Sequence, residues 1–460
     1  MFQVWIDSNK RTIIETAREL LRIPSIGTEP AGHDKPFGKE TDQALKFMLD
    51  LGTKYGFRVK NADGYAGHVE YGESKDYVAV LTHLDVVPPG NDWTYPPFAA
   101  EIHGNKIFAR GAIDDKGPAM AAFFGLLAVK ESGLPINRRT RLIFGLDEET
   151  DWRCMKHYFQ VEPLPWGGFT PDADFPLIYA EKGILHFTLR KSRYGQQGMK
   201  VEPVEIIGGE RPNMVPDVCM ATLSVETNYQ AEFLSRLEQY CQTENISFDV
   251  REIKPGSVLL TIKGQSAHGS TPDRGVNAIR CMGKVLSQFP VADLDLWEFV
   301  ALSDTEGRFL GIDCSDSFSG ALSCNLGMIS MDTDSFKLVF DVRYPVDRTG
   351  TELVKLVQQT ISSLDFLIDV HNDKQPLYVP KESSVVRTLQ QVYERITGAS
   401  GEPLAIGGGT YARAIPNTVA FGPLFPGMKD LAHQRDEFIE IEHLLQLTNI
   451  YAHAIYELSK

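Results

Sequence analysis

The sequence predicts an α/β fold in which an α+β domain is inserted into a domain with a mostly parallel central sheet. Short apolar runs at residues 77–82 and 140–146 are typical of strands buried on both faces, and a helical pattern at 118–131 separates them. This alternation of strand, helix and strand favours a parallel sheet covered by helices. Near residue 184 the pattern changes to alternating, half-exposed strands, and after about residue 380 a helical, glycine-rich pattern returns.

Helices are predicted before and between the two buried strands. Residues 8–22 carry apolar side chains at helical spacing behind a cap at Asp7 or Ser8, and residues 40–55 repeat the pattern. The helix between the strands is predicted to begin near Pro118, because proline is favoured in a first helical turn.

The middle of the chain reads as an α+β domain. Strands are predicted there at 184–190, 258–263 and 336–343, and helices at 229–242, 276–288 and 351–364. Two stretches, 204–225 and 321–346, each carry a turn followed by alternating strand residues, a pattern consistent with an internal duplication. Amphipathic helices then follow at 384–397 and 440–458. The expected domains are 1–183 with 381–460, and an insertion at 184–380.

Composition limits the classes of protein that the chain can belong to. At 460 residues it exceeds the roughly 250–300 that one hydrophobic core supports, so at least two domains are expected. The net charge of −15 argues against nucleic acid or an anionic membrane surface as a partner. The first residues lack the pattern of a signal peptide, and the chain has no long apolar stretch. Its six cysteines are scattered without a Cys-x-x-Cys pair, which is typical of reduced thiols and predicts a cytoplasmic protein.

Five residues, each in its own short motif, are candidate metal ligands: His83, Asp114, Glu149, Asp172 and His433. In open α/β sheets, bound molecules and ions lie beyond the carboxyl ends of the strands. His83 and the pair Glu148-Glu149 are predicted to lie there. Two histidines and three carboxylates can hold two zinc-like ions. Three carboxylates leave one net positive charge on two divalent ions, which a bridging hydroxide neutralises, and such sites lower the pKa of water from about 15.7 to about 7.

Each candidate also has a simpler reading. His83, with Asp85 two residues on, could be a strand-end histidine beside an acidic helix cap, or a ligand whose tautomer Asp85 fixes. Asp114 and Asp115 could cap a helix, although two adjacent carboxylates beside a buried helix repel each other unless a cation is present.

The remaining acids are similarly open. The Glu148-Glu149 pair could form a solvated turn, or one residue could bind metal while its neighbour takes a proton from water. Asp172 and Asp174 are equally possible ligands, and His433 alone would pass for a loop residue. If His433 does join the others, the C-terminal segment must fold back onto the first domain.

Other catalytic patterns are missing from the sequence. It contains no His-Glu-x-x-His, no Gly-x-Ser-x-Gly and no Gly-x-x-x-x-Gly-Lys-Ser/Thr. The run Gly407-Gly408-Gly409-Thr410 lacks the lysine of a phosphate loop; it is either a flexible turn or a cradle of N–H groups for a substrate carboxylate. The ligand set, with a neighbouring glutamate free to act as a base, indicates hydrolysis of an amide bond.

Several motifs together resemble one family, the di-zinc aminoacylases, carnosinases and desuccinylases, and most of all its PepV-type bacterial dipeptidase branch. The matching motifs are His83-x-Asp85-Val86-Val87-Pro88, Gly111-Ala-Ile-Asp114-Asp115-Lys116-Gly117, Asp147-Glu148-Glu149, Asn213-Met214-Val215-Pro216, Gly264-Gln-Ser-Ala-His268-Gly269 and Gly407-Gly408-Gly409-Thr410-Tyr411. The resemblance runs from about residue 10 to the C-terminus. It implies a three-layer, metallo-aminopeptidase-like catalytic domain and an inserted lid.

The resemblance also implies roles. Asp114 bridges two ions, His83 and Asp172 complete one site, and Glu149 and His433 complete the other. The resemblance thus favours Asp172 over Asp174 as the ligand. Glu148 is the general base, Asp85 supports His83, and the peptide bond after Asp114 is expected to be cis. In the lid, His268 stabilises the oxyanion and Arg343 binds a substrate carboxylate. Asn213, Gly409 and Thr410 are further substrate-binding candidates.

The sequence hypothesis is therefore a metal-dependent dipeptidase that acts through a metal-bridging hydroxide on dipeptides with a free N-terminus. Two divalent ions are expected, zinc first, with manganese or cobalt as alternatives. The resemblance to the PepV-type branch, whose lid is enlarged, implies a self-sufficient monomer, and the long segment 184–380 fits that. The first rival hypothesis is an N-acyl or N-succinyl amino acid deacylase on the same scaffold. The second is a binder of metal or peptide without catalysis, which the intact ligand set and Glu148 disfavour.

Overall fold

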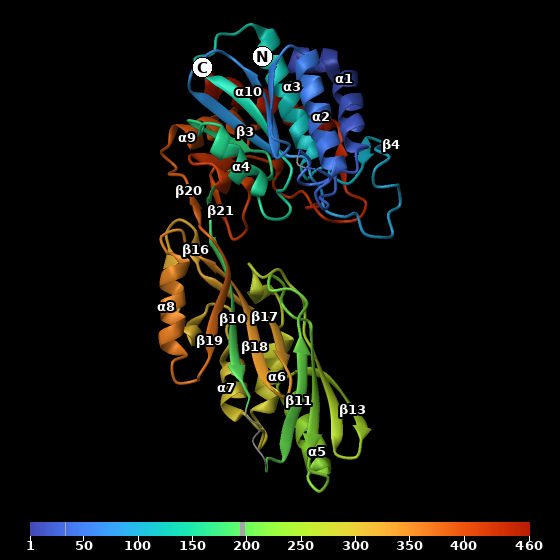
Figure 1. Ribbon diagram of the computed structural model, residues 1–460, viewed down its shortest axis with the longest axis vertical. Helices are drawn as coiled ribbons and strands as arrows, with labels where there is room; N and C mark the ends of the chain where they lie inside the picture. Colours follow the sequence, from blue (N-terminus) through green and yellow to red (C-terminus); the bar gives the residue numbers. More distant parts are fainter. Residues whose placement is uncertain (33, 194–197) are drawn as a thin grey trace. The chain divides into compact units, whose positions relative to one another are not determined.

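The chain forms two compact units in a computed structural model that describes residues 1–32, 34–193 and 198–460 (Figure 1). Unit 1 comprises Met1–Tyr179, Tyr378–Leu404 and Gly409–Lys460. Unit 2 comprises Ala180–Leu377 and Ala405–Gly408. Unit 1 is thus assembled from three separate segments, while unit 2 is nearly continuous in sequence.

Unit 1 is built on a mixed sheet with a parallel centre. The strands run in the order β1 (Arg58–Ala62), β2 (Ala66–Tyr71), β6 (Arg139–Gly145), β3 (Tyr77–His83), β7 (Gly167–Thr170), β22 (Thr418–Ala420), β9 (Ile178–Glu181) and β20 (Leu377–Tyr378), and β21 (Leu404–Ile406) pairs with β9. β3 is parallel to β6 and β7, and β22 is parallel to β7. β1, β2 and β9 add antiparallel pairs at the two sides.

Helices flank this sheet (Figure 1). They are α1 (Gln3–Leu21), α2 (Lys39–Lys54), α3 (Lys116–Ser132), α4 (Arg153–Val161), α9 (Ser384–Thr397) and α10 (Ile441–Ser459). α3 is buried along most of its length and packs against α10, and both contact β3. Its apolar composition on every face follows from that position, since no side of the helix meets water.

One predicted helix start is wrong. The first helix begins at Gln3, not behind a cap at Asp7 or Ser8. The Ser8 hydroxyl instead donates a hydrogen bond of 2.8 Å to the carbonyl of Val4, one turn earlier in the same helix. A serine can form this bond inside a helix as readily as it caps one. The presence of Ser8 was therefore not enough to locate the start of the helix.

Two small sheets complete unit 1. β24 (Phe438–Glu440) pairs antiparallel with β5 (Lys106–Phe108), which pairs with β4 (Glu101–His103). β23 (Pro423–Leu424) pairs with β8 (Ala173–Asp174), and a 3-10 helix η3 spans Tyr411–Ala414. The β5–β24 pair brings the segment after residue 108 beside the segment before residue 438.

Unit 2 contains an eight-stranded antiparallel sheet. Its order is β13 (Ser247–Lys254), β14 (Ser257–Lys263), β12 (Val218–Val225), β11 (Val201–Gly208), β17 (Ser323–Met331), β18 (Ser335–Tyr344), β10 (Gly183–Ser192) and β19 (Leu367–Lys374). The helices are α5 (Gln230–Thr243), α6 (Ala278–Leu286), α7 (Leu294–Leu302) and α8 (Gly350–Thr360), with 3-10 turns η1 (Pro272–Arg274) and η2 (Arg308–Leu310) and a short pair β15 (Ser315–Asp316) and β16 (Gly320–Ala321).

The strands of unit 2 alternate in burial as the sequence predicted. Along β12, Cys219, Ala221 and Leu223 are buried while Val218 and Met220 are exposed. One face of the sheet therefore carries the hydrophobic core and the other is more open. The predicted fold class, α/β with a parallel centre and an α+β insertion, is confirmed. Among the described helices, none has the length and apolar character needed to cross a membrane.

Candidate metal centre

The five predicted ligands of unit 1 lie in loops and strand ends that the fold brings together. His83 is the last residue of β3, and Glu149 follows the parallel neighbour β6. Asp114 precedes α3, Asp172 lies between β7 and β8, and His433 lies in the loop before β24. The peptide bond between Asp114 and Asp115 is cis, as the family resemblance implied.

Asp114 lies between the two histidines. Its Oδ1 is 3.0 Å from Nε2 of His83, and its Oδ2 is 3.2 Å from Nε2 of His433. Nε2 of His433 is also 3.0 Å from Oε2 of Glu149, and Nε2 of His83 is 3.8 Å from Oδ2 of Asp172. One carboxylate thus faces two separate groups, one containing Asp172 and the other Glu149. Asp174, in contrast, is exposed.

The ring of His83 is held by Asp85, chiefly through the backbone. Nδ1 of His83 lies 2.9 Å from the Asp85 carbonyl oxygen and 3.6 Å from the Asp85 carboxylate. A carbonyl can only accept, so Nδ1 donates the hydrogen bond to Asp85, and Nε2 is the ring atom that faces the carboxylate of Asp114. The Asp85 carboxylate accepts a bond of 3.0 Å from the Glu149 N–H. The His83 N–H donates to the Asp115 side chain at 3.1 Å.

These residues fit a divalent metal ion. Nε2 of His83 is buried without a hydrogen-bond donor among the described residues, and it faces carboxylate oxygens that also accept. Candidate ligand atoms of His83, Asp114 and Glu149 lie within 4.8 Å of one another, as do those of His83, Glu148 and Asp172. Two atoms bound at roughly 2.0–2.1 Å to a tetrahedral zinc ion lie about 3.3 Å apart, close to the spacing of the histidine–aspartate pairs.

The electrostatics point the same way. Burial raises the pKa of Glu148 well above its usual value, and the Asp172 carboxylate raises it further. Burial also raises the pKa of Asp172 to about 6 and raises that of Glu149. Hydrogen bonds to Asp114 and Glu149 raise the pKa of His433 to about 10. A cluster of partly buried carboxylates with these shifts is stabilised by added positive charge, which divalent ions supply.

The acidic run after β6 is divided between structural and site residues. Asp147 is buried and accepts bonds from the Arg153 N–H at 2.8 Å and from the Thr150 hydroxyl, so it fixes the turn into α4. The carbonyl of Glu148 accepts a bond of 2.7 Å from the Trp152 indole. The turn is thus not a fully solvated one, and its backbone is held in place around Glu148.

Tyr411 supports His83 from a side that the sequence reading did not anticipate. The tyrosine is fully buried, its ring lies edge-on to that of His83 at 6.2 Å between centroids, and its hydroxyl is 2.6 Å from Sγ of Cys154. A Cβ at Gly145 would lie 2.2 Å from the Tyr411 hydroxyl, so only glycine allows this approach at the end of β6. The sequence signal was the Tyr411 of the glycine-rich motif, whose partners become visible only in three dimensions.

The glycine-rich run is shared between the units. Gly407 and Gly408 belong to unit 2, whereas Gly409 and Thr410 belong to unit 1. The Thr410 hydroxyl accepts a bond of 3.2 Å from the Ala412 N–H and so caps η3. A Cβ at Gly409 would lie 3.0 Å from Nε of Arg413. Both residues therefore have local structural roles, and their predicted contact with substrate stays a prediction.

The candidates of unit 2 lie in neighbouring turns. The Gly269 N–H donates to the Asn213 carbonyl at 2.8 Å, and Met214 forms a bridge with His268. Nδ1 of His268 is 2.7 Å from the Ser270 hydroxyl. This arrangement places Asn213 and His268 side by side.

The third candidate, Arg343, is held by its own unit. It is buried, and its Nε and Nη2 donate to Asp341 at 2.7 and 2.9 Å. Its Nη1 donates to the Gly407 carbonyl at 3.2 Å. The guanidinium is thus fixed in orientation, and among the described residues these bonds use three of its five N–H groups.

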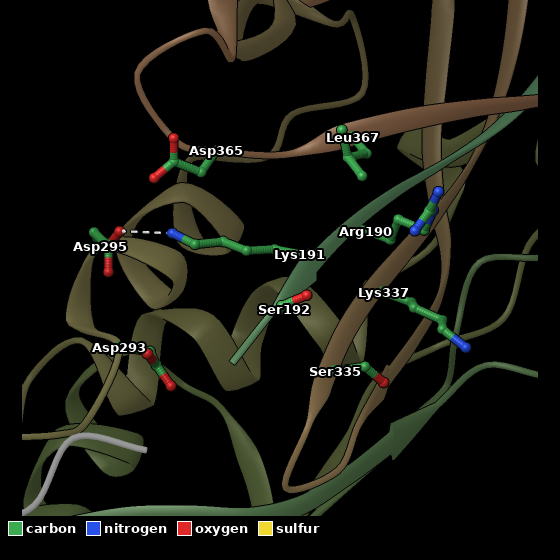
Figure 2. A pocket seen from close by; sticks show the side chains of 9 residues that line it. All are labelled: Arg190, Lys191, Ser192, Asp293, Asp295, Ser335, Lys337, Asp365 and Leu367. Atoms are coloured by element: carbon green, nitrogen blue, oxygen red, sulfur yellow. Dashed lines mark ion pairs between the residues drawn. The ribbon is translucent and has the colours of Figure 1, made fainter. Parts of the chain in front are cut away.

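A separate hollow of about 660 Å³ in unit 2 contains none of these residues (Figure 2). Its basic and acidic side chains largely neutralise each other, since Lys191 pairs with Asp295 at 3.6 Å and Arg190 pairs with Asp369. Asp293 likewise pairs with Arg193 at 3.0 Å. The hollow thus has no strong excess of either charge, and it lies apart from the candidate metal ligands.

Comparisons with known proteins identify the family of the chain. The profile of the Peptidase family M20/M25/M40 matches residues 79–457. The Bacillus subtilis protein named "Putative dipeptidase YtjP" is 43% identical over 469 residues, covering 100% of both chains. Among solved structures, the aminoacylhistidine dipeptidase of Vibrio alginolyticus gives a TM-score of 0.58 at 14% identity, covering 97% of this chain and 96% of its own. Human carnosine dipeptidase 1 gives a TM-score of 0.57 at 14% identity, covering 99% of this chain and 98% of its own.

Proposed function

The chain belongs to peptidase family M20/M25/M40 and is a hydrolase of peptide bonds, and on that premise we propose that it is a dipeptidase with two divalent metal ions. The observation that carries the proposal is the position of Asp114 between His83 and His433. A carboxylate that offers one oxygen to each of two histidines is suited to bridging two ions. The dipeptide substrate is supported by the full-length relative named as a dipeptidase.

The ligands follow from the two groups around Asp114. His83 and Asp172 would hold one ion, Glu149 and His433 the other, and Asp114 both. Zinc suits two histidines and three carboxylates, and manganese or cobalt also bind such sets. Ions held there would polarise the carbonyl of the scissile bond and make a nearby water more acidic.

Glu148 is the residue proposed to move the proton. It lies in the same group as His83 and Asp172. Those two residues are the proposed metal ligands of the group, which leaves Glu148 for the transfer of the proton. Its carboxylate would take a proton from the attacking water and return it to the leaving amine. The bond from the Trp152 indole to the Glu148 carbonyl holds the backbone of this residue while its side chain stays available.

Unit 2 is proposed to act as the substrate-binding lid. His268 would stabilise the oxyanion, and Arg343 would bind the substrate carboxylate with the N–H groups that Asp341 and Gly407 leave unused. Asn213, Gly409 and Thr410 keep their proposed roles in substrate binding. A single chain is proposed to be sufficient, and light scattering on the active protein measures whether it is a monomer.

The decisive experiment compares substrates and metals together. Protein stripped by a chelator and reloaded with zinc, manganese or cobalt is assayed on a panel of dipeptides and on N-acetyl and N-succinyl amino acids. Dipeptides with a free N-terminus should be hydrolysed fastest, and only after metal is restored. Preference for the N-acyl compounds would make the protein a deacylase, and full activity without metal would refute the metal centre.

A further inference from the structure

Glu437 is a buried carboxylate that joins two of the ligand segments. It lies four residues after His433 and is fully buried. Its register is set by the β5–β24 pair, since the Ala109 N–H donates to the Glu437 carbonyl at 3.0 Å directly beyond the Phe438–Phe108 pair. The side chain therefore points from the His433 segment toward the segment that leads to Asp114.

The carboxylate is surrounded by donors from that second segment. Oε1 accepts from the N–H groups of Ile113 at 2.8 Å and Asp114 at 3.2 Å. Oε2 accepts from the Gly111 N–H at 3.1 Å and from Nη1 of Arg110 at 2.7 Å. A carboxylate offers about four acceptor sites, so these partners saturate it. The loop is thus wrapped around Glu437, and the last of its donors is the backbone of Asp114 itself.

Arg110 closes the connection from the other side. The arginine is almost fully buried, and its Nη1 also donates to the Gln434 carbonyl at 3.2 Å, next to His433. Its guanidinium lies 5.3 Å from the ring of Trp93. Glu437 and Arg110 together therefore fix the distance between the Asp114 loop and the His433 loop, which are more than 300 residues apart in sequence.

We propose that Glu437 is a positioning residue for the metal centre, which sets the spacing of Asp114 and His433 without binding an ion itself. The inference rests on the proposed two-metal function and deepens it. Since His433 is half exposed and lies in a loop, packing alone holds it weakly. The buried ion pair replaces that missing packing, as outer partners of metal ligands commonly do.

The test uses Glu437→Gln in the full chain. The amide keeps the shape of the side chain but replaces one acceptor by a donor, which must face an N–H group or the Arg110 guanidinium. Affinity for at least one metal ion should fall by roughly 10- to 100-fold in calorimetric titration. The visible spectrum of the cobalt-loaded variant should also change, because that spectrum reports ligand geometry.

Glu162→Gln is the matched control. Glu162 is another buried glutamate of unit 1, it pairs with the buried Arg141 at 2.6 Å, and its described contacts include none of the ligands. This variant should lose stability but keep wild-type metal affinity and the wild-type cobalt spectrum. Equal loss of metal in both variants would overturn the inference, because it would reflect stability in general.

Glu437→Asp covers the case in which the glutamine variant does not fold. Aspartate keeps the charge opposite Arg110 but is one methylene shorter, so it cannot reach all the donors of the loop. The folded Glu437→Asp variant should show a weaker metal affinity than wild type in calorimetric titration. Wild-type affinity in this variant would overturn the inference. Failure of the wild-type protein to bind two ions would instead refute the proposed function.

Discussion

The Asp85 carboxylate accepts a hydrogen bond of 3.0 Å from the backbone N–H of Glu149. The same residue holds the His83 ring through its carbonyl oxygen. Asp85 therefore connects a proposed ligand of one ion with a proposed ligand of the other. Its role is wider than support of a single histidine, and it can be measured separately for each ion.

Asp85→Asn and Asp85→Ala should lower metal affinity to different extents. The asparagine oxygen can still accept a hydrogen bond from the Glu149 N–H, so we expect metal affinity to fall by about 10-fold. Alanine leaves that N–H unpaired, so we expect metal affinity to fall by nearly 100-fold. Calorimetric titration of zinc into the stripped variants measures both values. Wild-type affinity in the alanine variant would contradict the connecting role of Asp85.

The adjacent glutamates provide a paired test of the proposed mechanism. Glu148→Gln should reduce kcat by at least about 100-fold, because a general base contributes roughly 10²–10⁴-fold. Its metal content, measured by mass spectrometry of the dialysed protein, should remain that of the wild type. Glu149→Gln should lose metal as well as activity. If Glu148→Gln stays active with its metals bound, the base must be another residue.

Gly145→Ala should destabilise unit 1. The added methyl group would lie 2.2 Å from the Tyr411 hydroxyl and 2.7 Å from its ring, and this tyrosine is fully buried. Overpacking of this kind costs about 1–3 kcal/mol, which should lower the melting temperature in calorimetry. Gly27→Ala is the control, since nothing lies within 4 Å of a Cβ there. Equal melting temperatures for the two variants would contradict the packing at Gly145.

His68 should make the protein sensitive to mild acid. Burial, with the nearby positive charge of Arg141, lowers the pKa of His68 from 6.5 to about 4. The unfolded chain then binds a proton at higher pH than the folded chain, so stability is full above pH 6.5 and is lost as the pH falls toward 4. The shift corresponds to roughly 3 kcal/mol in all, at about 1.4 kcal/mol for each pKa unit.

The acid effect can be separated from that of other groups. His68→Gln can still bond to the Tyr158 hydroxyl, which lies 2.8 Å from Nδ1 of His68, but it does not titrate. Its urea midpoint should fall less between pH 7 and pH 5 than that of the wild type. The exposed His103 in the same unit provides the control variant His103→Gln, which should follow the wild type. Parallel pH curves for all three proteins would refute the assignment to His68.

The pattern of apolar residues was sufficient to predict most of the regular elements. The run 77–82 became β3 (Tyr77–His83), and the helix predicted at 118–131 became α3 (Lys116–Ser132). β3 is buried throughout and α3 along most of its length, so both consist mainly of apolar residues and can be recognised from the local sequence alone. The predicted start of α1 was wrong because the sequence alone does not distinguish a serine inside a helix from a serine at its cap.

The site was only partly accessible from sequence. His83 ends one strand and Glu149 follows the parallel neighbour of that strand, so their meeting at one sheet edge could be predicted. The contact of Glu437 with Arg110 could not, because both are charged residues whose types suggest solvent exposure and whose partners lie far apart in the chain. The acceptor for the His83 ring was likewise a backbone carbonyl, a group that every residue has.

The position of β22 has a consequence for the order in which the protein is made. This strand, Thr418–Ala420, lies between β7 and β9 in the sheet of unit 1, so those two strands have open edges until the ribosome has passed residue 420. Unit 2 comes almost entirely from Ala180–Leu377 and can fold while synthesis continues. Most of unit 2 is therefore synthesised before β22 is available to complete the sheet of unit 1.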